Sequence, residues 1–322
     1  MEIEKLKLAL MQYGDDLQLY GNGIAEDALG ELEQTEQKIL ALAAELFAKF
    51  EKKGVRPDKA TLEYIEKLKK RISELRNNVF EEEFEELKKE MTSLSETSNT
   101  FWKIFFAAAG IDVVLLTRRD LERISKYGIY NGNTVRQIFE KLKINDTDRI
   151  FDTLSDALQK GKSLKQAWED VKDQLTQTRR FVKSEIDAIV NGVANDVSIA
   201  FAMKNGHKLK YSAVMDKTTC QRCKALDGKV FKADSPELPV LPQHYNCRCQ
   251  LIPVADGKEI ESASFQKYLK SLPKERQKER LGKNKYTLWA KGDYMLKKYE
   301  NPLPGQRKSL EGIITEAQYL LS

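Results

Sequence analysis

The chain reads TTCQRCKALDG at residues 218–228 and LPQHYNCRCQLIP at 241–253. These two stretches hold all four cysteines of the chain, as a C-x-x-C pair and a C-x-C pair, together with one of its two histidines. Two such pairs on either side of a loop can close a tetrahedron of thiolate and imidazole ligands around Zn²⁺. The sequence therefore predicts a small zinc-organised module over 211–254. Its candidate ligands are Cys220, Cys223, His244, Cys247 and Cys249.

Five candidates compete for four places in this site. The C-x-C spacing of Cys247 and Cys249 is tighter than the usual knuckle, whereas His244 and Cys247 have a comfortable gap. Which ligand is unused stays open, and so do two other readings: two disulfides, or four unrelated buried thiols. A zinc ion held by four protein ligands has no open position for water, so the site would be structural and would contribute to folding.

The composition is that of a helix-rich protein with its own core. Apolar residues make up 41% and charged residues 32% of 322 residues, which is too charged for a membrane protein. The most apolar run, Phe101–Leu116, is interrupted by Lys103 and Asp112, so we expect a buried core segment and no membrane partner. The N-terminus lacks the pattern of a signal peptide. We therefore expect assembly in a reducing cytoplasm, which disfavours disulfides.

The net charge of +5 hides an asymmetry between the two ends of the chain. Residues 1–98 carry 22 acidic and 15 basic side chains, whereas 267–308 carry 13 basic and 4 acidic ones. Different charges suggest different partners for the two ends. The basic stretch is either an ordinary solvated face or a contact for an anion or nucleic acid.

Apolar residues recur at helical spacing over 23–52 and again from Leu62 to Phe80. KKGVRPD (52–58) separates them, so the pattern predicts two long helices joined as an antiparallel hairpin, an architectural or assembly element. The charge run 81–90 is expected to be the solvated end of the second helix. The small polar residues of 91–100 are expected to form a boundary.

Helices are predicted next at Arg119–Lys126, Thr134–Leu142, Asp146–Lys160, Ser163–Leu175 and Thr178–Lys204. Ser163 with Gln166 is a capping box, and Asn131-Gly132 and Asn205-Gly206 mark turns. Strands are predicted within 207–216, at 229–231 and at 250–254. The stretch Phe265–Ser322 is predicted to be helical and basic, broken at 301–305.

The predicted fold class is therefore α+β and mostly helical. Four regions follow along the chain: a helical hairpin serving as an assembly surface, a helical middle region, a zinc-binding module with short strands, and a basic helical tail. Their predicted bounds are 1–98, 99–206, 207–264 and 265–322.

The cysteine block resembles a known family at particular residues. The pattern is Asp216-x-x-x-Cys220-x-x-Cys223-x-x-x-Asp227-Gly228, then Pro242-x-His244-x-x-Cys247-Arg248-Cys249 and Pro253. It is similar to the Mu F-like head morphogenesis proteins of tailed bacteriophages, also called minor head or minor capsid proteins. The resemblance covers roughly 150–300, including 161–171, 181–206 and 265–293. One departure is Lys183-Ser184-Glu185, where the family often has Arg-Thr-Glu.

The resemblance implies a protein without catalytic activity that is built into the phage head in few copies near the portal vertex. It implies a portal protein and capsid or scaffold proteins as partners, assembly in the host bacterial cytoplasm, and a place inside the virion. Contact with DNA, or travel with it, would use the basic stretch 267–308, and such binding would weaken steeply with salt.

Two other functions stay open. A zinc-dependent nucleic-acid-binding protein would use the same tail, although only Tyr268, Tyr286 and Trp289 there could stack on bases. A toxin-like enzyme, such as an ADP-ribosyltransferase or nuclease, would need catalytic groups. His207 has no assignable nucleophile or carboxylate, and the chain contains no phosphate-binding glycine loop and no H-E-x-x-H.

Overall fold

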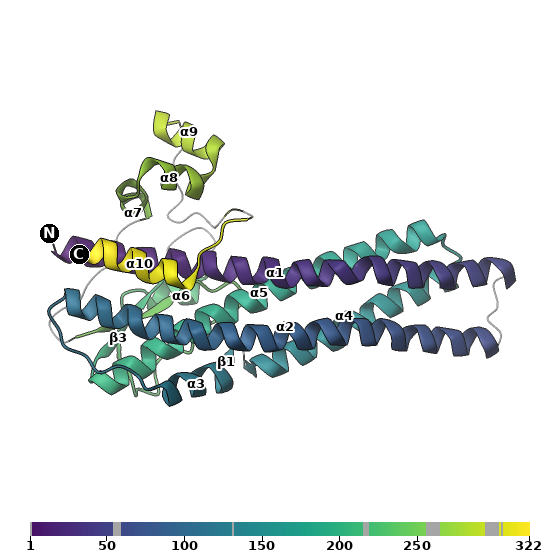
Figure 1. Cartoon of the computed structure of the whole chain (residues 1–322), viewed down its shortest axis with the longest axis horizontal. Helices are drawn as coiled ribbons and strands as arrows, with labels where there is room; N and C mark the ends of the chain where they lie inside the picture. The colour runs from purple at the N-terminus through teal and green to yellow at the C-terminus, as the bar shows by residue number, and fades with distance from the viewer. Residues whose placement is uncertain are drawn as a thin grey trace. The chain divides into compact units, whose positions relative to one another are not determined.

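The computed structural model describes residues 2–53, 59–130, 132–214, 219–255, 265–293, 303 and 305–322. Helix dominates and the strands are few and short (Figure 1). The helices are α1 Glu2–Lys53, α2 Lys59–Ala108, α3 Arg118–Tyr127, α4 Val135–Gln159, α5 Leu164–Asn205, α6 Gln221–Leu226, α7 Phe265–Ser271, α8 Lys274–Leu281, α9 Lys283–Lys291 and α10 Leu310–Leu321. The strands are β1 Ile129–Tyr130, β2 Asn133–Thr134, β3 Lys208–Ser212, β4 Val230–Lys232 and β5 Gln250–Val254. This agrees with the predicted class, α+β and mostly helical.

The described chain packs as two units. Unit 1 comprises Met1–Ile24, Lys88–Thr134 and Ile186–Ser322, and unit 2 comprises Ala25–Leu87 and Val135–Glu185. The long helices α1, α2 and α5 each contribute residues to both units. The four regions predicted along the sequence stay a prediction, because packing groups segments that are distant in the chain.

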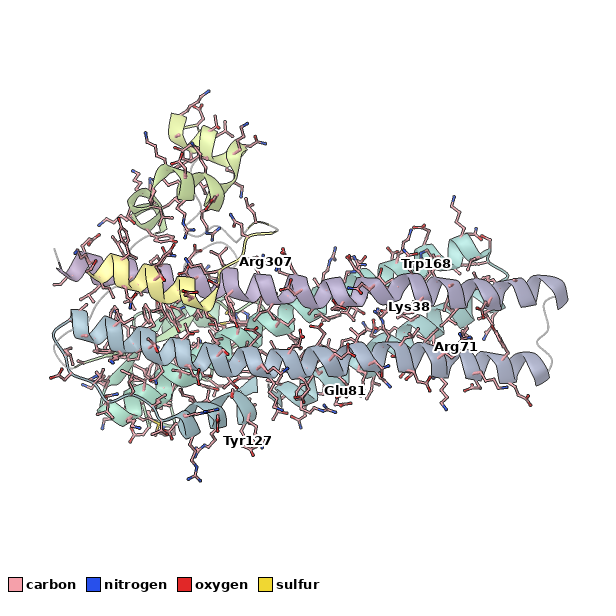
Figure 2. The ribbon with its side chains drawn as sticks, viewed as in Figure 1. Lys38, Arg71, Glu81, Tyr127, Trp168 and Arg307 are labelled. Atoms are coloured by element: carbon pink, nitrogen blue, oxygen red, sulfur yellow. The ribbon has the colours of Figure 1, made fainter. Side chains whose placement is uncertain are left out.

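Helices α1 and α2 run antiparallel, as the sequence predicts. In unit 1 the Tyr13 hydroxyl donates to Ser98 Oγ at 2.8 Å. In unit 2 the Arg76 guanidinium donates to Thr35 Oγ1 at 2.6 Å and the Tyr64 hydroxyl donates to Glu45 Oε2 at 3.0 Å. Within this unit a step forward along α1 therefore matches a step back along α2. Exposed charged side chains such as Lys38 cover the outer faces of both helices (Figure 2).

Both helices are longer than predicted, and the expected boundary at 91–100 is wrong. Helix α2 continues through that stretch, with Met91, Leu94, Ser95 and Ser98 buried. Ser95 bonds back to the Met91 carbonyl at 2.8 Å, which satisfies its hydroxyl inside the helix. Small polar side chains here allow close helix packing and do not mark a linker.

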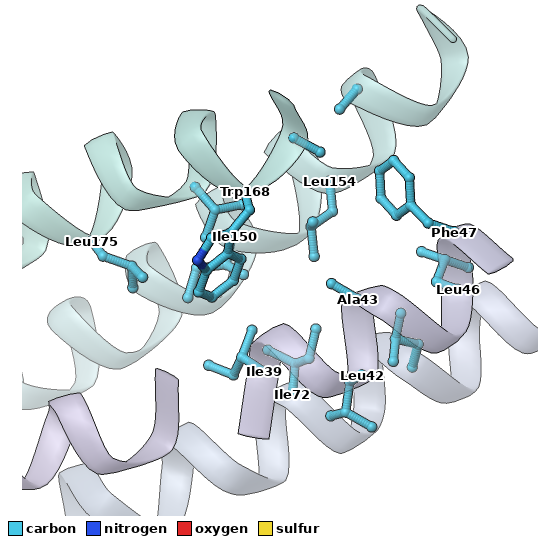
Figure 3. Close-up of a cluster of buried hydrophobic side chains, with 14 residues drawn as sticks. Ile39, Leu42, Ala43, Leu46, Phe47, Ile72, Ile150, Leu154, Trp168 and Leu175 are labelled. Carbon is cyan, nitrogen blue, oxygen red and sulfur yellow. The ribbon is translucent and has the colours of Figure 1, made fainter. Parts of the chain in front are cut away.

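The core of unit 2 is a cluster of apolar side chains from four helices, which includes Ile39, Ile72, Ile150 and Trp168 (Figure 3). Next to this core, Arg76 and Asp146 form an ion pair with both side chains 1% exposed and a 2.7 Å separation. Arg76 also donates to the Leu32 carbonyl at 2.9 Å. A pair this deeply buried is stabilising only with such extra hydrogen bonds.

Two predicted helix breaks are absent. Thr134–Leu142 and Asp146–Lys160 form the single helix α4, and Ser163–Leu175 and Thr178–Lys204 form the single helix α5. No glycine or proline separates the members of either pair, so the backbone hydrogen bonds continue. The Ser163–Gln166 capping box is confirmed, with Ser163 N donating to Gln166 Oε1 at 3.0 Å and Gln166 N to Ser163 Oγ at 3.4 Å.

Aromatic side chains form much of the core of unit 1. Phe101, Trp102, Phe105 and Phe106 are buried, which confirms the prediction of a core for the aromatic part of Phe101–Leu116, whereas Val114 farther along is 60% exposed. Trp102 Nε1 donates to Ser198 Oγ of α5 at 3.1 Å. Among the described helices, α5 has the length and apolarity to cross a membrane, and 72% of its most apolar window is buried. That burial is what a core helix requires.

A three-stranded antiparallel sheet with the order β4-β3-β5 lies in unit 1. Strand β3 falls within the predicted strand 207–216, β5 matches 250–254, and β4 lies one residue beyond 229–231. Tyr211 of β3 is opposite Leu251 of β5, and Leu209 of β3 is opposite Phe231 of β4. The sheet brings the two cysteine stretches together.

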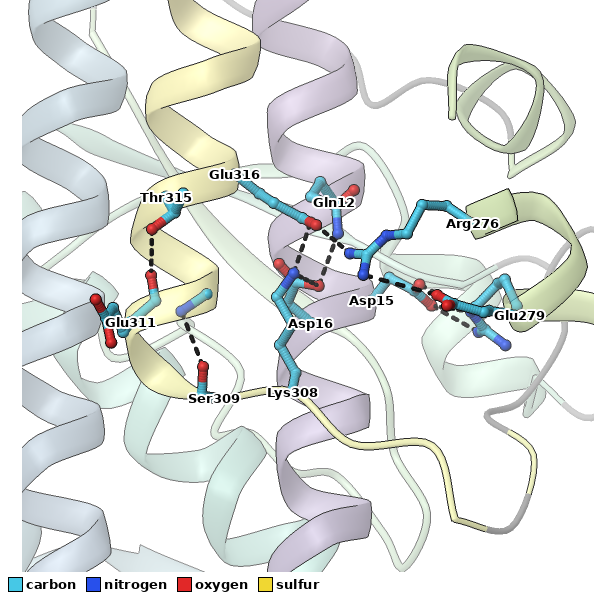
Figure 4. A network of polar contacts seen from close by, with 12 residues as sticks. Gln12, Asp15, Asp16, Arg276, Glu279, Lys308, Ser309, Glu311, Thr315 and Glu316 are labelled. Atoms are coloured by element: carbon cyan, nitrogen blue, oxygen red, sulfur yellow. Dashed lines mark hydrogen bonds and ion pairs between the residues drawn. The ribbon is translucent and has the colours of Figure 1, made fainter. Parts of the chain in front are cut away.

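The C-terminal segments of unit 1 are attached to α1 through buried charges (Figure 4). Arg280 of α8 donates to Asp15 at 2.6–3.0 Å, and Tyr268 of α7 donates to the same carboxylate at 3.0 Å. Lys308, which precedes α10, pairs with Asp16 at 3.4 Å. Part of the basic stretch 267–308 is therefore internal structure.

Candidate metal centre

The first ligand pair lies where α6 begins. Cys220 is the N-cap of α6, and its sulfur accepts a hydrogen bond from the Cys223 backbone N–H at 3.4 Å. Cys223 is then in the first turn of the helix, 1% exposed. This C-x-x-C turn directs two sulfurs to the same side, as the spacing predicts.

The second pair directly precedes β5. Cys247 and Cys249 are buried, and the Cys247 N–H bonds to the His244 carbonyl at 3.1 Å, which closes a tight turn. Asn246 in this turn has a φ of 58°, a left-handed conformation that asparagine tolerates. The turn places the His244 ring beside the sulfurs.

All five predicted ligands meet in this cluster, as two overlapping trios. One contains Cys220, Cys223 and His244, and the other contains Cys223, Cys247 and Cys249. Within each trio the ligand atoms lie within 4.8 Å of one another. Cys223 belongs to both, and its sulfur is 3.5 Å from His244 Nε2. All four cysteines are free thiols, so this structure contains neither of the two disulfides that the sequence left open.

Crowding and burial shift the pKa values of the four cysteines in different directions. The pKa of Cys247 is lowered to about 5, first because the Cys249 thiol donates to its sulfur, and the same contact raises the pKa of Cys249 far above its usual range. Burial raises the pKa of Cys223 to about 11, whereas the backbone N–H of Cys223 lowers the pKa of Cys220. Four thiolates at this spacing repel one another unless a cation binds among them.

The histidine is oriented as a metal ligand requires. Its Nδ1 lies 2.7 Å from the Tyr245 carbonyl, which selects the tautomer that carries the proton on Nδ1. The lone pair of Nε2 is then directed toward Cys223. Burial alone would lower the pKa of His244, but the Tyr245 carbonyl and the sulfurs of Cys247 and Cys220 raise it. This donor set, thiolate and imidazole, fits a metal ion of the zinc type.

The surrounding residues fix the loops that carry the ligands. Tyr211 is fully buried, and its hydroxyl donates a hydrogen bond to Cys223 Sγ at 3.3 Å. Asp227 accepts from the Ala213 N–H at 2.8 Å, and Gly228, with a φ of 78°, donates to the Tyr211 carbonyl at 2.9 Å. The Asp-Gly of the motif is therefore a turn that joins α6 to the sheet.

Two residues of this centre were not predicted from the sequence. Asn191 and Asn195 of α5, both buried, bond to the backbone of the Cys247–Leu251 segment. Their signal in the sequence is a pair of amides four residues apart in the more apolar second half of α5, a spacing that places both on one helix face.

Other predicted residues lie elsewhere. His207 stacks on Phe106 with ring centroids 4.7 Å apart, outside the cysteine cluster. The prediction that Tyr268 could stack on bases is wrong, because Tyr268 is 2% exposed and its hydroxyl donates a hydrogen bond to Asp15. Glu185 of the Lys183-Ser184-Glu185 triplet is buried in α5. Asp216 of the motif lies outside the described residues.

A known protein family matches the part of the chain that contains this cluster. Residues 148–252 match the family model described as Phage Mu protein F like protein. The matched segment contains all five candidate ligands, both asparagines and most of the three-stranded sheet. No curated protein and no solved structure matches the chain. The predicted resemblance to the Phage Mu protein F like family is therefore confirmed over residues 148–252.

Proposed function

We propose that this chain is a minor head protein of a tailed bacteriophage, built into the virion in few copies near the portal vertex and acting in head morphogenesis. The observation that carries the proposal is the Cys/His cluster, which can hold a metal ion and lies inside the family-matched segment. The chemistry is structural, because a metal with four protein ligands has no open position for water.

The proposed metal is one zinc ion, held by four of the five residues Cys220, Cys223, His244, Cys247 and Cys249. Cys223 belongs to both trios, so we take it as one of the four. The ion neutralises the clustered thiolates and joins α6 to the turn before β5. A module whose sheet has only three short strands gains much of its rigidity from such a link.

The proposed partners of the helical hairpin are the portal protein and capsid or scaffold proteins. Support comes from the exposed acidic side chains of α2, which include Glu82 and Glu86. These two residues belong to the locally acidic run 81–86, and such a run favours docking to a basic surface and speeds encounter. Assembly takes place in the cytoplasm of the host bacterium, and the protein is then carried in the head, where it contacts the DNA or accompanies it.

DNA contact is proposed for the basic stretch 267–308, but not for all of its charges. Arg280 and Lys308 are buried in ion pairs with Asp15 and Asp16. Lysines exposed on α7–α9 are the groups available to phosphates: Lys270, Lys274, Lys283 and Lys291. A contact made by lysines alone is sequence-independent and salt-sensitive.

The test of the head function is co-purification of the tagged full-length chain with the portal and capsid proteins of the same phage. We expect retention of portal protein and assembly into heads, weakened by the double substitution E82Q/E86Q. Substitution of exposed Asp152 on α4 is the control. A wild-type chain that retains neither protein, and that is missing from purified heads, would contradict the proposal.

The DNA contact is tested with a variant in which the four exposed lysines are replaced by glutamine. For every phosphate that a lysine no longer neutralises, the slope of log affinity against log salt becomes shallower by about 0.9. Deletion of 267–308 is the poorer experiment, because it also removes the buried Arg280 and Lys308. An unchanged affinity and salt slope in the lysine variant would dispose of the DNA contact and leave the head function standing.

A further inference from the structure

Two asparagines of α5 contact the backbone on which two candidate ligands lie. Asn191 Nδ2 donates to the Cys247 carbonyl at 2.7 Å and lies 3.3 Å from the Cys249 carbonyl. Asn195 Nδ2 lies 3.3 Å from the same Cys249 carbonyl, and Asn195 Oδ1 accepts from the Leu251 N–H at 2.6 Å. The side chains are linked to each other, with Asn195 Nδ2 to Asn191 Oδ1 at 3.0 Å.

These bonds satisfy an edge of the sheet that would otherwise be buried without partners. The Tyr211 N–H and C=O both bond toward β4, so the residue opposite, Leu251, turns its own N–H away from β3. Strand β5 has no strand on that outer side among the described residues. A buried unpaired backbone group costs about as much as a missing hydrogen bond.

The asparagine amide is the side chain that suits this edge. It offers a donor and an acceptor in one plane, as a peptide group does, so Asn195 takes the place of a neighbouring strand. A carboxylate at this position would accept from Leu251 but would have no N–H for the Cys249 carbonyl. A leucine of similar volume would offer neither group. Asn191 and Asn195 are 4% and 2% exposed, so water cannot substitute for them.

We propose that Asn191 and Asn195 are positioning residues of the metal centre. They hold Cys247 and Cys249 against α5 before any ion binds, so that metal binding does not have to order this loop. The inference rests on the proposed metal centre and deepens it. It also makes α5 the rigid support of the site, because the second ligand pair is held by this helix as well as by the sheet.

The test compares N195D, N191D and N195L with the wild type as full-length reduced proteins. Zinc affinity is measured by competition with a chromophoric chelator, and Co²⁺ absorption reports ligand geometry. Partners of this kind are worth about 10–100-fold in metal affinity, so we expect decreases in that range and an altered Co²⁺ spectrum. S198A is the matched control: Ser198 is buried on the same helix and accepts from Trp102. It should lower the melting temperature and leave zinc affinity unchanged.

A second readout separates this inference from the metal proposal. In chelator-stripped protein, thiol reagents should modify Cys247 and Cys249 faster in N195D than in the wild type, since the loop is held without metal. A wild type that binds no zinc would overturn the metal centre, and the thiol rates would still decide the role of the asparagines. Equal thiol rates in stripped N195D and wild type, or equal zinc affinities where zinc binds, would overturn the inference.

Discussion

Replacing Arg280 by methionine should release the α7–α9 segment from α1. Arg280 is 4% exposed and Asp15 is 1% exposed, and two guanidinium nitrogens contact the carboxylate at 2.6–3.0 Å. Removing one partner of such a pair leaves a buried charge and costs about 3–5 kcal/mol. Methionine fills similar space without charge, so the destabilisation reports mainly the loss of the guanidinium from the buried Asp15 carboxylate.

The assay combines the melting temperature with hydrogen exchange of the α7–α9 amides. Hydrogen exchange is needed because a chain of two units does not guarantee a two-state melting transition, and it reports on this segment alone. Protection in α7 and α8 should fall in R280M. The double variant D15N/R280M should recover most of it, because the buried charge is gone and the amide can still bond Tyr268. K274M, at an exposed position on α8, should stay within about 0.5 kcal/mol of wild type. An R280M protein with wild-type protection, or a double variant no better than R280M, would refute this reasoning.

Three further predictions follow from single contacts. Burial raises the pKa of Asp196 to about 7, so its ionisation opposes folding. Stability should fall as pH rises from about 4 to about 7, and D196N should remove that decrease, of the order of 4 kcal/mol, in melts recorded across this range. In α5, G192A should destabilise by about 1–3 kcal/mol despite its better helix propensity, because a Cβ there would lie 2.1 Å from the Tyr130 ring. G30A, which meets nothing within 4 Å in α1, should stabilise by up to about 1 kcal/mol, and equal signs for the two variants would contradict the packing argument. C223S should abolish zinc retention while far-UV helicity persists, because the long helices have cores of their own; a C223S protein that retains zinc would exclude Cys223 as a required ligand.

Local signals predicted much of this fold. The C-x-x-C turn, the Ser163 cap and the β5 strand are each specified by adjacent residues, so the sequence suffices to find them. Helix lengths were harder to predict. The small polar residues at 91–100 have the composition of a linker, and only the burial of Ser95 and Ser98 against neighbouring segments reveals a helix interior.

Long-range polar contacts could not be predicted. Arg280 resembles any other basic residue of the tail, and its partner Asp15 is 265 positions away. Asn195 resembles an ordinary helical residue until β5 is placed beside it. The five ligands were found because their chemistry is unusual, whereas the residues that hold them are common types whose role depends on tertiary packing.

The central claim is that one divalent ion unites the two cysteine stretches. The most direct measurement is zinc K-edge X-ray absorption on the full-length protein purified under reducing conditions, with metal stoichiometry from the same sample. The account predicts one zinc per chain with a sulfur-dominated shell near about 2.3 Å. A protein that is folded, reduced and free of metal, or a zinc shell made of oxygen, would contradict it.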